Sequence, residues 1–286
     1  MIENSHLSRR SLLCAAALAA AAAPFAGLPS ALGAAAPAGA TPQFKGLKIG
    51  VCSDTFRKFD VAATIKGTSR VGLSYVSIKD FHLPMKSTKE QRQAVSKQFR
   101  DGGVIPLSCG VVTMTRDEAN IRNAFEYARD AGMPTMVCNP EPESLPTLDK
   151  MVKEFDIRLA IHNHGPGDKR WPLPSDVFEK VEKYDQRIGL CIDVGHTGRL
   201  KADPAEAILK YRSRLWDVHM KDISKMEPSG DCIEGGRGVL NLKAIFQALL
   251  EIKFEHLIGI EYEKDADDPV PGLAETVGCF RGILNW

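Results

Sequence analysis

Four short apolar runs in the second half of the chain each end in a residue that can bind a metal ion or transfer a proton. These end residues are His162, Asp193, His219 and Glu261. Because side chains alternate between the two faces of a β-strand, the apolar residues take one face and the end residue takes the other. Any one of them could instead be a core histidine or a helix cap, but their repetition at equivalent positions favours one divalent ion: Mn²⁺, Co²⁺, Zn²⁺ or Mg²⁺.

The elements that must position these residues alternate regularly along the chain. Apolar runs that predict strands lie at 47–52, 75–79, 104–109, 135–139, 157–162, 188–193, 215–219 and 257–261. Segments with helical periodicity between them include 61–71, 91–101, 119–131, 176–184, 204–212 and 242–252. Eight strand–helix units predict an α/β fold, a single (β/α)8 TIM barrel over residues 41–286. A doubly wound open sheet is disfavoured because no glycine-rich phosphate loop follows the first strand.

Residues 1–40 differ in composition from the rest of the chain. Ser8-Arg9-Arg10-Ser11 stands before an alanine-rich stretch, and the small residues near Ala34 suit cleavage by a signal peptidase. This pattern resembles a twin-arginine signal peptide, which implies Tat export, a cleaved leader with a small-residue linker, and a periplasmic protein. A Sec signal and a disordered tail stay open as alternatives. The stretch is too short and too rich in alanine for stable membrane insertion.

Charge and cysteine usage exclude several classes of partner. The chain has 37 basic and 36 acidic residues, and removing the two arginines and one glutamate of the leader leaves the two signs equal. Nucleic-acid binding depends on clustered positive charge, so neither nucleic acid nor an anionic membrane surface is expected as a partner. Six cysteines follow the leader, none of them in a C-x-x-C pair. Four lie at or near the ends of apolar runs, which predicts buried free thiols rather than disulfides.

The motifs around the four end residues carry a resemblance to a known family. They are His162-Asn163-His164-Gly165, Asp193-Val194-Gly195-His196, His219-Met220-Lys221-Asp222, Glu234-Gly235-Gly236-Arg237-Gly238 and Ile260-Glu261-Tyr262-Glu263. Over about residues 45–286 the sequence resembles the xylose isomerase-like TIM-barrel superfamily, and within it the sugar phosphate isomerase/epimerase group. The family's ketose epimerases hold their metal with Glu, Asp, His and Glu from strands five to eight. The resemblance therefore implies His162, Asp193, His219 and Glu261 as metal ligands.

His162 departs from the family pattern, and the departure bears on the chemistry. The epimerases use two glutamates to remove and return a proton on opposite faces of the substrate, and this chain keeps only Glu261. Two anionic ligands in place of three make a bound ion a stronger Lewis acid. The resemblance implies proton abstraction next to a ketone, with Glu261 as the base. His164, His196 or Lys221 would return a proton or donate to the oxyanion.

Three residues outside this group are candidates for substrate binding. Lys79 and His82 follow the second strand, where a substrate hydroxyl could bind, and Trp171 could stack on a sugar ring. A solvated loop for the first two residues and ordinary packing for the tryptophan explain them equally well. The loops 163–174 and 223–238 follow ligand strands, so both are candidate lids and substrate walls.

The expected function is that of a divalent-metal-dependent sugar isomerase or epimerase. Export favours a non-phosphorylated keto-sugar or 3-keto-glycoside as the small-molecule carbohydrate substrate, because phosphorylated sugars are scarce outside the cytoplasm. The nearest rival is a lyase that performs β-elimination on a keto-glycoside. A metal-dependent hydrolase like the superfamily's abasic-site endonucleases and a non-catalytic sugar-binding barrel are further alternatives. The sequence leaves open whether the barrel forms a homodimer.

Overall fold

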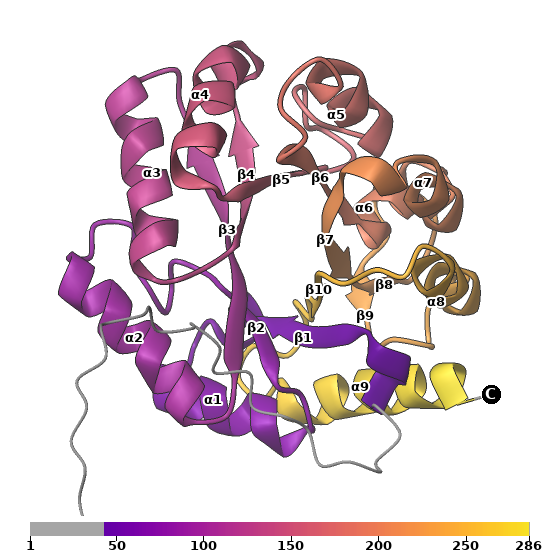
Figure 1. The fold of residues 1–286 in the computed structure, drawn as a ribbon. Helices are drawn as coiled ribbons and strands as arrows, with labels where there is room; N and C mark the ends of the chain where they lie inside the picture. Colours follow the sequence, from indigo (N-terminus) through magenta and orange to yellow (C-terminus); the bar gives the residue numbers. More distant parts are fainter. Residues whose placement is uncertain (1–42, 286) are drawn as a thin grey trace, which may run out of the picture. The chain divides into compact units, whose positions relative to one another are not determined.

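The computed structural model describes residues 43–285, so the leader expected over residues 1–40 lies outside the described part. Within it, parallel strands close into a barrel in the order β1-β10-β7-β6-β5-β4-β3-β2. Figure 1 shows the helices arranged around these strands. The predicted (β/α)8 barrel is confirmed.

Each strand expected from the sequence is present. The barrel strands are β1 Lys48–Cys52, β2 Tyr75–Ile78, β3 Ile105–Met114, β4 Thr135–Pro140, β5 Arg158–His162, β6 Ile188–Asp193, β7 Leu215–Met220 and β10 Leu257–Ile260. The largest difference is in β3, which was expected to end at residue 109. Its register against β4 shifts between Cys109 and Val112, and this irregularity lets the strand continue to Met114. A short antiparallel pair not expected from the sequence, β8 Asp222–Ile223 and β9 Cys232–Ile233, follows β7.

The helices include three segments that periodicity did not identify, α4, α6 and α9. The helices are α1 Val61–Arg70, α2 Lys89–Asp101, α3 Glu118–Asp130, α4 Leu145–Phe155, α5 Pro174–Val181, α6 Val194–Arg199, α7 Pro204–Lys210, α8 Leu242–Glu251 and α9 Val270–Asn285. Short 3-10 turns lie at Gln43–Gly46, Ser53–Phe56, Pro142–Ser144 and Arg212–Arg214. α7 begins at a capping residue followed by proline, and the Asp203 side chain accepts from the backbone N–H groups of Ala205 and Glu206.

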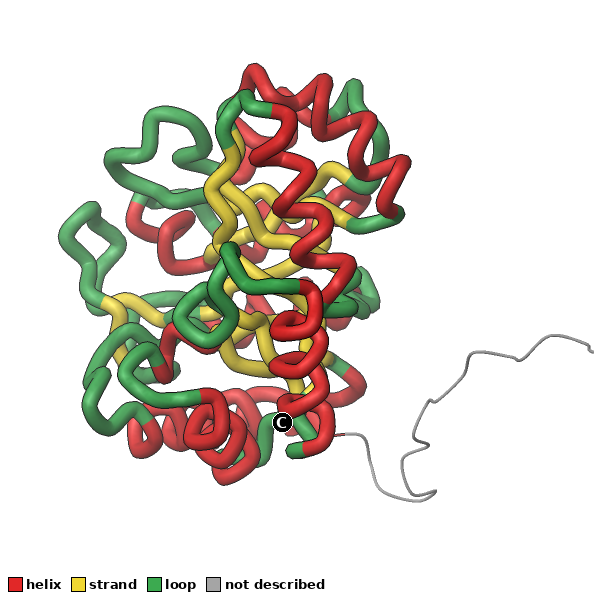
Figure 2. The backbone as a smooth tube through the Cα atoms, turned by 90° about the vertical axis from the view of Figure 1, so that its left-hand side faces the viewer, coloured by secondary structure: helices red, strands yellow, loops and turns green. Residues whose placement is uncertain are grey.

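The apolar core and the polar interior use opposite faces of the same strands. Figure 2 shows the strands enclosed by helices when seen from the side. Strand residues such as Ile49 and Ile161 join the main core together with helix residues. The alternate, inward positions carry smaller side chains, among them Val137, Ala160 and Cys191, which form a separate small cluster. The inward face therefore leaves room for the polar residues at the strand ends.

Two further expectations concern the cysteines and the membrane. All six cysteines of the described part are free thiols, and four of them are buried. Among residues 43–285, no helix combines the length and apolar character that crossing a membrane requires.

Candidate metal and proton-transfer site

The C-terminal ends of β5, β6, β7 and β10 bring His162, Asp193, His219 and Glu261 together. One ligand atom of each residue lies within 4.8 Å of the ligand atoms of the other three. His162 Nε2 is 3.4 Å from Asp193 Oδ2, and His219 Nδ1 is 3.5 Å from Glu261 Oε1. All four residues are buried. Strand alternation thus directs four potential ligands from four neighbouring strands at one point.

Several potential ligand atoms of this cluster lack a hydrogen-bond partner among residues 43–285. Both ring nitrogens of His162, both ring nitrogens of His219 and Asp193 Oδ2 are buried without a hydrogen-bond partner in the part of the chain described. Buried polar atoms left unpaired cost free energy, so proteins satisfy them with water or an ion. Nitrogen and carboxylate donors at this mutual spacing are also what a single divalent ion requires. The residues present therefore fit a divalent metal ion.

Asp193 has a second role, at the start of α6. Its Oδ1 accepts a 2.7 Å hydrogen bond from the backbone N–H of His196, while Oδ2 faces the cluster. Asn163 fixes the position of Asp193, because Asn163 Oδ1 accepts from the backbone N–H of Asp193 at 3.0 Å. The amide of Asn163 in turn donates to Thr197 Oγ1. The carboxylate therefore caps a helix and offers an oxygen to the cluster at the same time.

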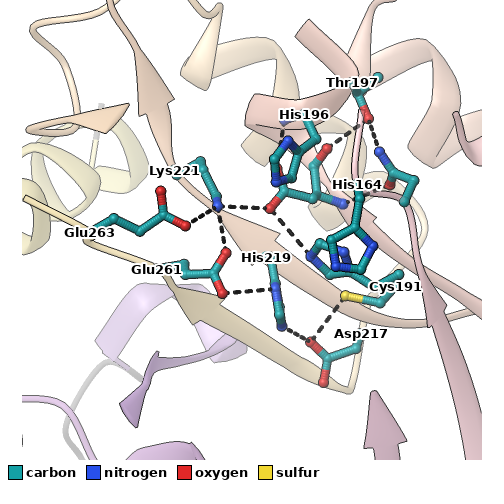
Figure 3. A network of polar contacts seen from close by, with 12 residues as sticks. His164, Cys191, His196, Thr197, Asp217, His219, Lys221, Glu261 and Glu263 are labelled. Atoms are coloured by element: carbon teal, nitrogen blue, oxygen red, sulfur yellow. Dashed lines mark hydrogen bonds and ion pairs between the residues drawn. The ribbon is translucent and has the colours of Figure 1, made fainter. Parts of the chain in front are cut away.

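Two lysine ammonium groups lie against the carboxylates of the cluster. Lys79 Nζ is 2.8 Å from Glu261 Oε1, and Lys221 Nζ is 2.5 Å from Glu261 Oε2. Lys221 Nζ also lies 3.2 Å from Asp193 Oδ2 and 2.9 Å from Glu263 Oε1 (Figure 3). Burial alone would raise the pKa of Glu261, but Lys221 and Lys79 hold that pKa well below its usual range. Glu261 is therefore a carboxylate whose two oxygens each already have a cationic neighbour.

Two more histidines lie beside the cluster, His164 and His196. Their ring centroids are 4.3 Å and 5.8 Å from that of His162, and both side chains appear with the cluster in Figure 3. Burial lowers the pKa of each, so both imidazoles are neutral near pH 7. Because an arginine can only donate, the 3.1 Å contact from Arg199 Nη1 makes His196 Nδ1 an acceptor and leaves the proton on Nε2. His164 Nδ1 lies 3.2 Å from Asn139 Nδ2.

His82 and Trp171 are buried, and their ring nitrogens contact other parts of the chain. His82 is buried, and its Nδ1 and Nε2 lie 2.9 Å from Ser53 Oγ and 2.9 Å from Thr64 Oγ1, respectively. Trp171 has no exposed surface, and its Nε1 donates to the carbonyl of Pro140 at 2.8 Å. The substrate-binding roles expected for these two residues are therefore not supported. Lys79, the third of that group, directs its ammonium at Glu261 instead of at open space.

Asp217 belongs to the site, and the sequence analysis missed it. It lies on β7 two residues before His219, so both side chains point inward. Asp217 Oδ1 is 3.9 Å from His219 Nε2 and accepts from the Cys191 thiol at 3.9 Å (Figure 3). Burial raises the pKa of Asp217 to about 6. At this distance the carboxylate faces the ring of His219 without a hydrogen bond, and the spacing Asp-x-His was the signal that could have placed both side chains on one face.

The two loops expected to act as lids are tied to the barrel. Asp222 accepts from the backbone N–H groups of Gly236 and Gly238, and a Cβ at residue 238 would lie 2.1 Å from Asp222 Oδ1. In the other loop, Asp168 Oδ2 accepts from Asn139 Nδ2 on β4 at 3.4 Å, and Trp171 Nε1 donates to the carbonyl of Pro140 at the end of β4. These contacts favour fixed walls over moving lids.

A cavity of about 570 Å³ lies against the lysine side of the cluster. It shares Glu263 with the Lys221 ion pair, and its lining combines charged residues with apolar side-chain surface. The lining residues are Arg199, Gly230, Asp231, Cys232, Ile233, Glu263 and Lys264.

Comparison with known proteins supports the architecture. A profile of the family described as Xylose isomerase-like TIM barrel matches residues 69–283. An inosose dehydratase from Clostridium tetani is 27% identical over 140 residues, 43% of this chain and 46% of that protein, so the chain spans less than half of that relative. A 3-keto-D-glucoside 4-epimerase from E. coli superposes with a TM-score of 0.69 at 14% identity, over 82% of this chain and 99% of that one.

A second solved structure has a different kind of activity in its name. The probable 3-DHS dehydratase from Bacillus anthracis superposes with a TM-score of 0.64 at 12% identity, over 84% of this chain and 99% of that one. At such identities the superpositions establish the fold alone. The profile, in contrast, covers most of the sequence and includes all four clustered strand ends. The chain therefore belongs to the xylose isomerase-like TIM barrel family.

Proposed function

We propose that the barrel is a divalent-metal-dependent enzyme that removes the proton next to the ketone of a non-phosphorylated keto-sugar or 3-keto-glycoside and returns it, as an isomerase or epimerase. The observation that carries this proposal is the convergence of four ligand atoms from four strands, all within 4.8 Å of one another. A divalent ion held by His162, Asp193, His219 and Glu261 would polarise the substrate carbonyl and so acidify the neighbouring C–H.

Proton transfer needs a group other than the ligand Glu261. Its two oxygens are engaged by Lys79 and Lys221, which makes this carboxylate a weak base. His164 is the better candidate, because its imidazole is neutral and its side chain is partly exposed beside the cluster. Lys221 is a weak acid for the same reason, because the carboxylates of Asp193 and Glu261 hold its pKa well above its ordinary value, so His196 is the candidate that returns the proton. The Nε2–H of His196 is available to stabilise negative charge on the substrate oxygen.

Elimination is the second candidate, and the same site supports it. His162 replaces the glutamate that the family's epimerases use to return a proton, and its ring is buried and neutral because burial holds its pKa well below the usual range. An elimination does not require that return step. The names of the Clostridium tetani relative and the Bacillus anthracis structure are those of dehydratases. We also propose export by the twin-arginine route, which would supply unphosphorylated substrates.

Solvent exchange distinguishes the two activities. The Mn²⁺-loaded protein is incubated in D₂O with a panel of keto-sugars and 3-keto-glycosides, and products are analysed by NMR and mass spectrometry. Deuterium in recovered sugar or in an epimer would support the isomerase or epimerase, whereas an unsaturated ketone would support the lyase. His256→Gln, at the opposite end of the barrel, serves as the matched control. An absence of exchange and of product from every sugar that binds would contradict both activities.

A further inference from the structure

The candidate metal ligands already have counter-charges within the chain. Lys79 Nζ lies 2.8 Å from Glu261 Oε1, and Lys221 Nζ lies 2.5 Å from Glu261 Oε2 and 3.2 Å from Asp193 Oδ2. The side chain of Lys221 is fully buried, and that of Lys79 is nearly so. Both carboxylates of the ligand set therefore sit against an ammonium group from which water is excluded.

The charges around the lysines do not cancel. Besides the two ligand carboxylates, Asp54 Oδ2 lies 3.5 Å from Lys79 Nζ, and Glu263 Oε1 lies 2.9 Å from Lys221 Nζ. Four carboxylates thus face two ammonium groups, so the carboxylates outnumber the ammonium groups around the lysines. The site can accept a divalent ion, but the ion must then lie close to two positive charges that repel it.

Packing keeps Lys221 in this position. Gly195, in the first turn of α6, lies against the lysine side chain, and a Cβ on Gly195 would meet Lys221 Cγ at 2.4 Å and Cδ at 2.9 Å. The carboxylates of Asp193, Glu261 and Glu263 surround the ammonium at the other end. Moving the ammonium away would break these ion pairs, so we infer that it stays beside the carboxylates when an ion approaches.

We propose that Lys79 and Lys221 form a fixed cationic clamp that holds Glu261 and Asp193 in their ligand positions before an ion binds and lowers the affinity of the site for that ion. This inference rests on the metal site of the proposed function. The clamp weakens binding of the ion and makes its exchange faster. It also keeps the ligands in place, so they need no rearrangement when the ion binds.

The test measures metal affinity and the stability of the metal-free protein, neither of which requires a substrate. Lys221→Met and Lys79→Met keep an unbranched side chain, one atom shorter than lysine, and remove its charge. Mn²⁺ and Co²⁺ binding is measured by isothermal titration, and thermal unfolding is measured after chelation. Lys153→Met, on the exposed face of α4, controls for the loss of one positive charge. We expect Lys221→Met to bind Mn²⁺ at least about tenfold more tightly and to unfold at least about 5 °C lower without metal.

Each result decides for or against the clamp. Tighter binding in either lysine variant with unchanged binding in Lys153→Met supports it. If the wild type binds no ion and Lys221→Met does, the clamp is supported and the metal-dependent function is not. Equal or weaker binding in both lysine variants overturns the clamp and leaves the proposed function standing if the wild type binds Mn²⁺.

A third variant guards against misfolding of the lysine variants. Glu263→Gln removes a carboxylate that contacts Lys221, is not among the clustered ligands and is partly exposed, so the fold should tolerate it. The positive charge of Lys221 is then less neutralised by its neighbours, and Mn²⁺ binding should weaken about threefold or more. Unchanged Mn²⁺ affinity in this variant would overturn the proposal even if the lysine variants failed to fold.

Discussion

The two ends of the barrel both carry charge, but they arrange it in different ways. At the C-terminal end, the lysines and carboxylates contact one another from several strands, and the ring nitrogens of two histidines are left unpartnered. At the N-terminal end, a cavity of about 250 Å³ is lined by Lys48, Arg158, Glu255 and His256 among others, and in the described part none of these four forms an ion pair. The difference shows that charged residues alone do not mark a site. What sets the candidate site apart is the convergence of opposite charges around ligand atoms that lack a hydrogen-bond partner.

The largest effect is expected from replacing one of the four candidate ligands at the C-terminal end of the barrel. His219→Ala removes one of the four ligand donors, and we expect loss of stoichiometric metal and a decrease of about 10⁴-fold in turnover. Metal content after dialysis and turnover of the best substrate are the measurements. Arg158→Gln at the other end should change turnover by less than about twofold. Full metal occupancy in His219→Ala would show that the cluster is not the metal site.

Removal of the proton-transfer group should separate chemistry from metal binding. His164→Gln keeps a polar side chain but cannot accept a proton, so we expect solvent exchange to slow by about 10²–10⁴-fold. The metal content should stay at the wild-type level because His164 is not among the clustered ligands. If exchange persists at the wild-type rate, the base is a different group, and His196→Gln becomes the next variant to assay.

Asp217 should produce an intermediate effect. Asp217→Asn keeps the size of the side chain but loses the charge that faces His219 Nε2 at 3.9 Å. We expect metal affinity to fall by about 10–100-fold, as is typical when the partner of a ligand histidine is changed. A metal titration measures the affinity. The imidazole ¹⁵N chemical shifts of the metal-free protein show whether the ring of His219 has changed its tautomer. Unchanged affinity and unchanged shifts would limit Asp217 to a packing role.

At the N-terminal end the expected effect is on stability and is small. Burial, together with Arg158 and Lys48, lowers the pKa of His256 to about 4 from its ordinary value of 6.5. Because the folded state binds the proton less readily than the unfolded state, the contribution of His256 to the free energy of unfolding is complete above pH 6.5. Its contribution is lost as the pH falls toward 4. Since the ring is only partly buried, we expect a loss of about 1 kcal/mol, measured as the difference in urea unfolding between wild type and His256→Gln at pH 7 and at pH 4.5.

The sequence predicted the barrel and its strand ends because both depend on local patterns. Strand alternation places Asp193 and His219 on the inward face whatever surrounds them. It could not show that Trp171 is buried or that both ring nitrogens of His82 are engaged, since these facts depend on contacts with distant segments. Helix α6 went unrecognised because its six residues include two glycines and give no clear periodicity.

The ion-pair partners of the lysines could not be predicted from the sequence for a related reason. Lys79 and Glu261 are separated by 182 positions along the chain and meet only when the barrel closes between β1 and β10. Their residue types are informative, but their pairing is not encoded in local spacing. Asp217 is the opposite case, because its position two residues before His219 already placed it on the same face.

The anchored loops have a consequence for how substrate enters and leaves. Asp222 holds the segment after β7 through several backbone N–H groups, and Asn139 on β4 donates to Asp168 in the segment after β5. These contacts hold both segments in place, so we expect the proposed catalytic cycle to need no loop movement. Added viscogen should therefore slow only the diffusive capture of substrate and leave the maximal rate unaffected.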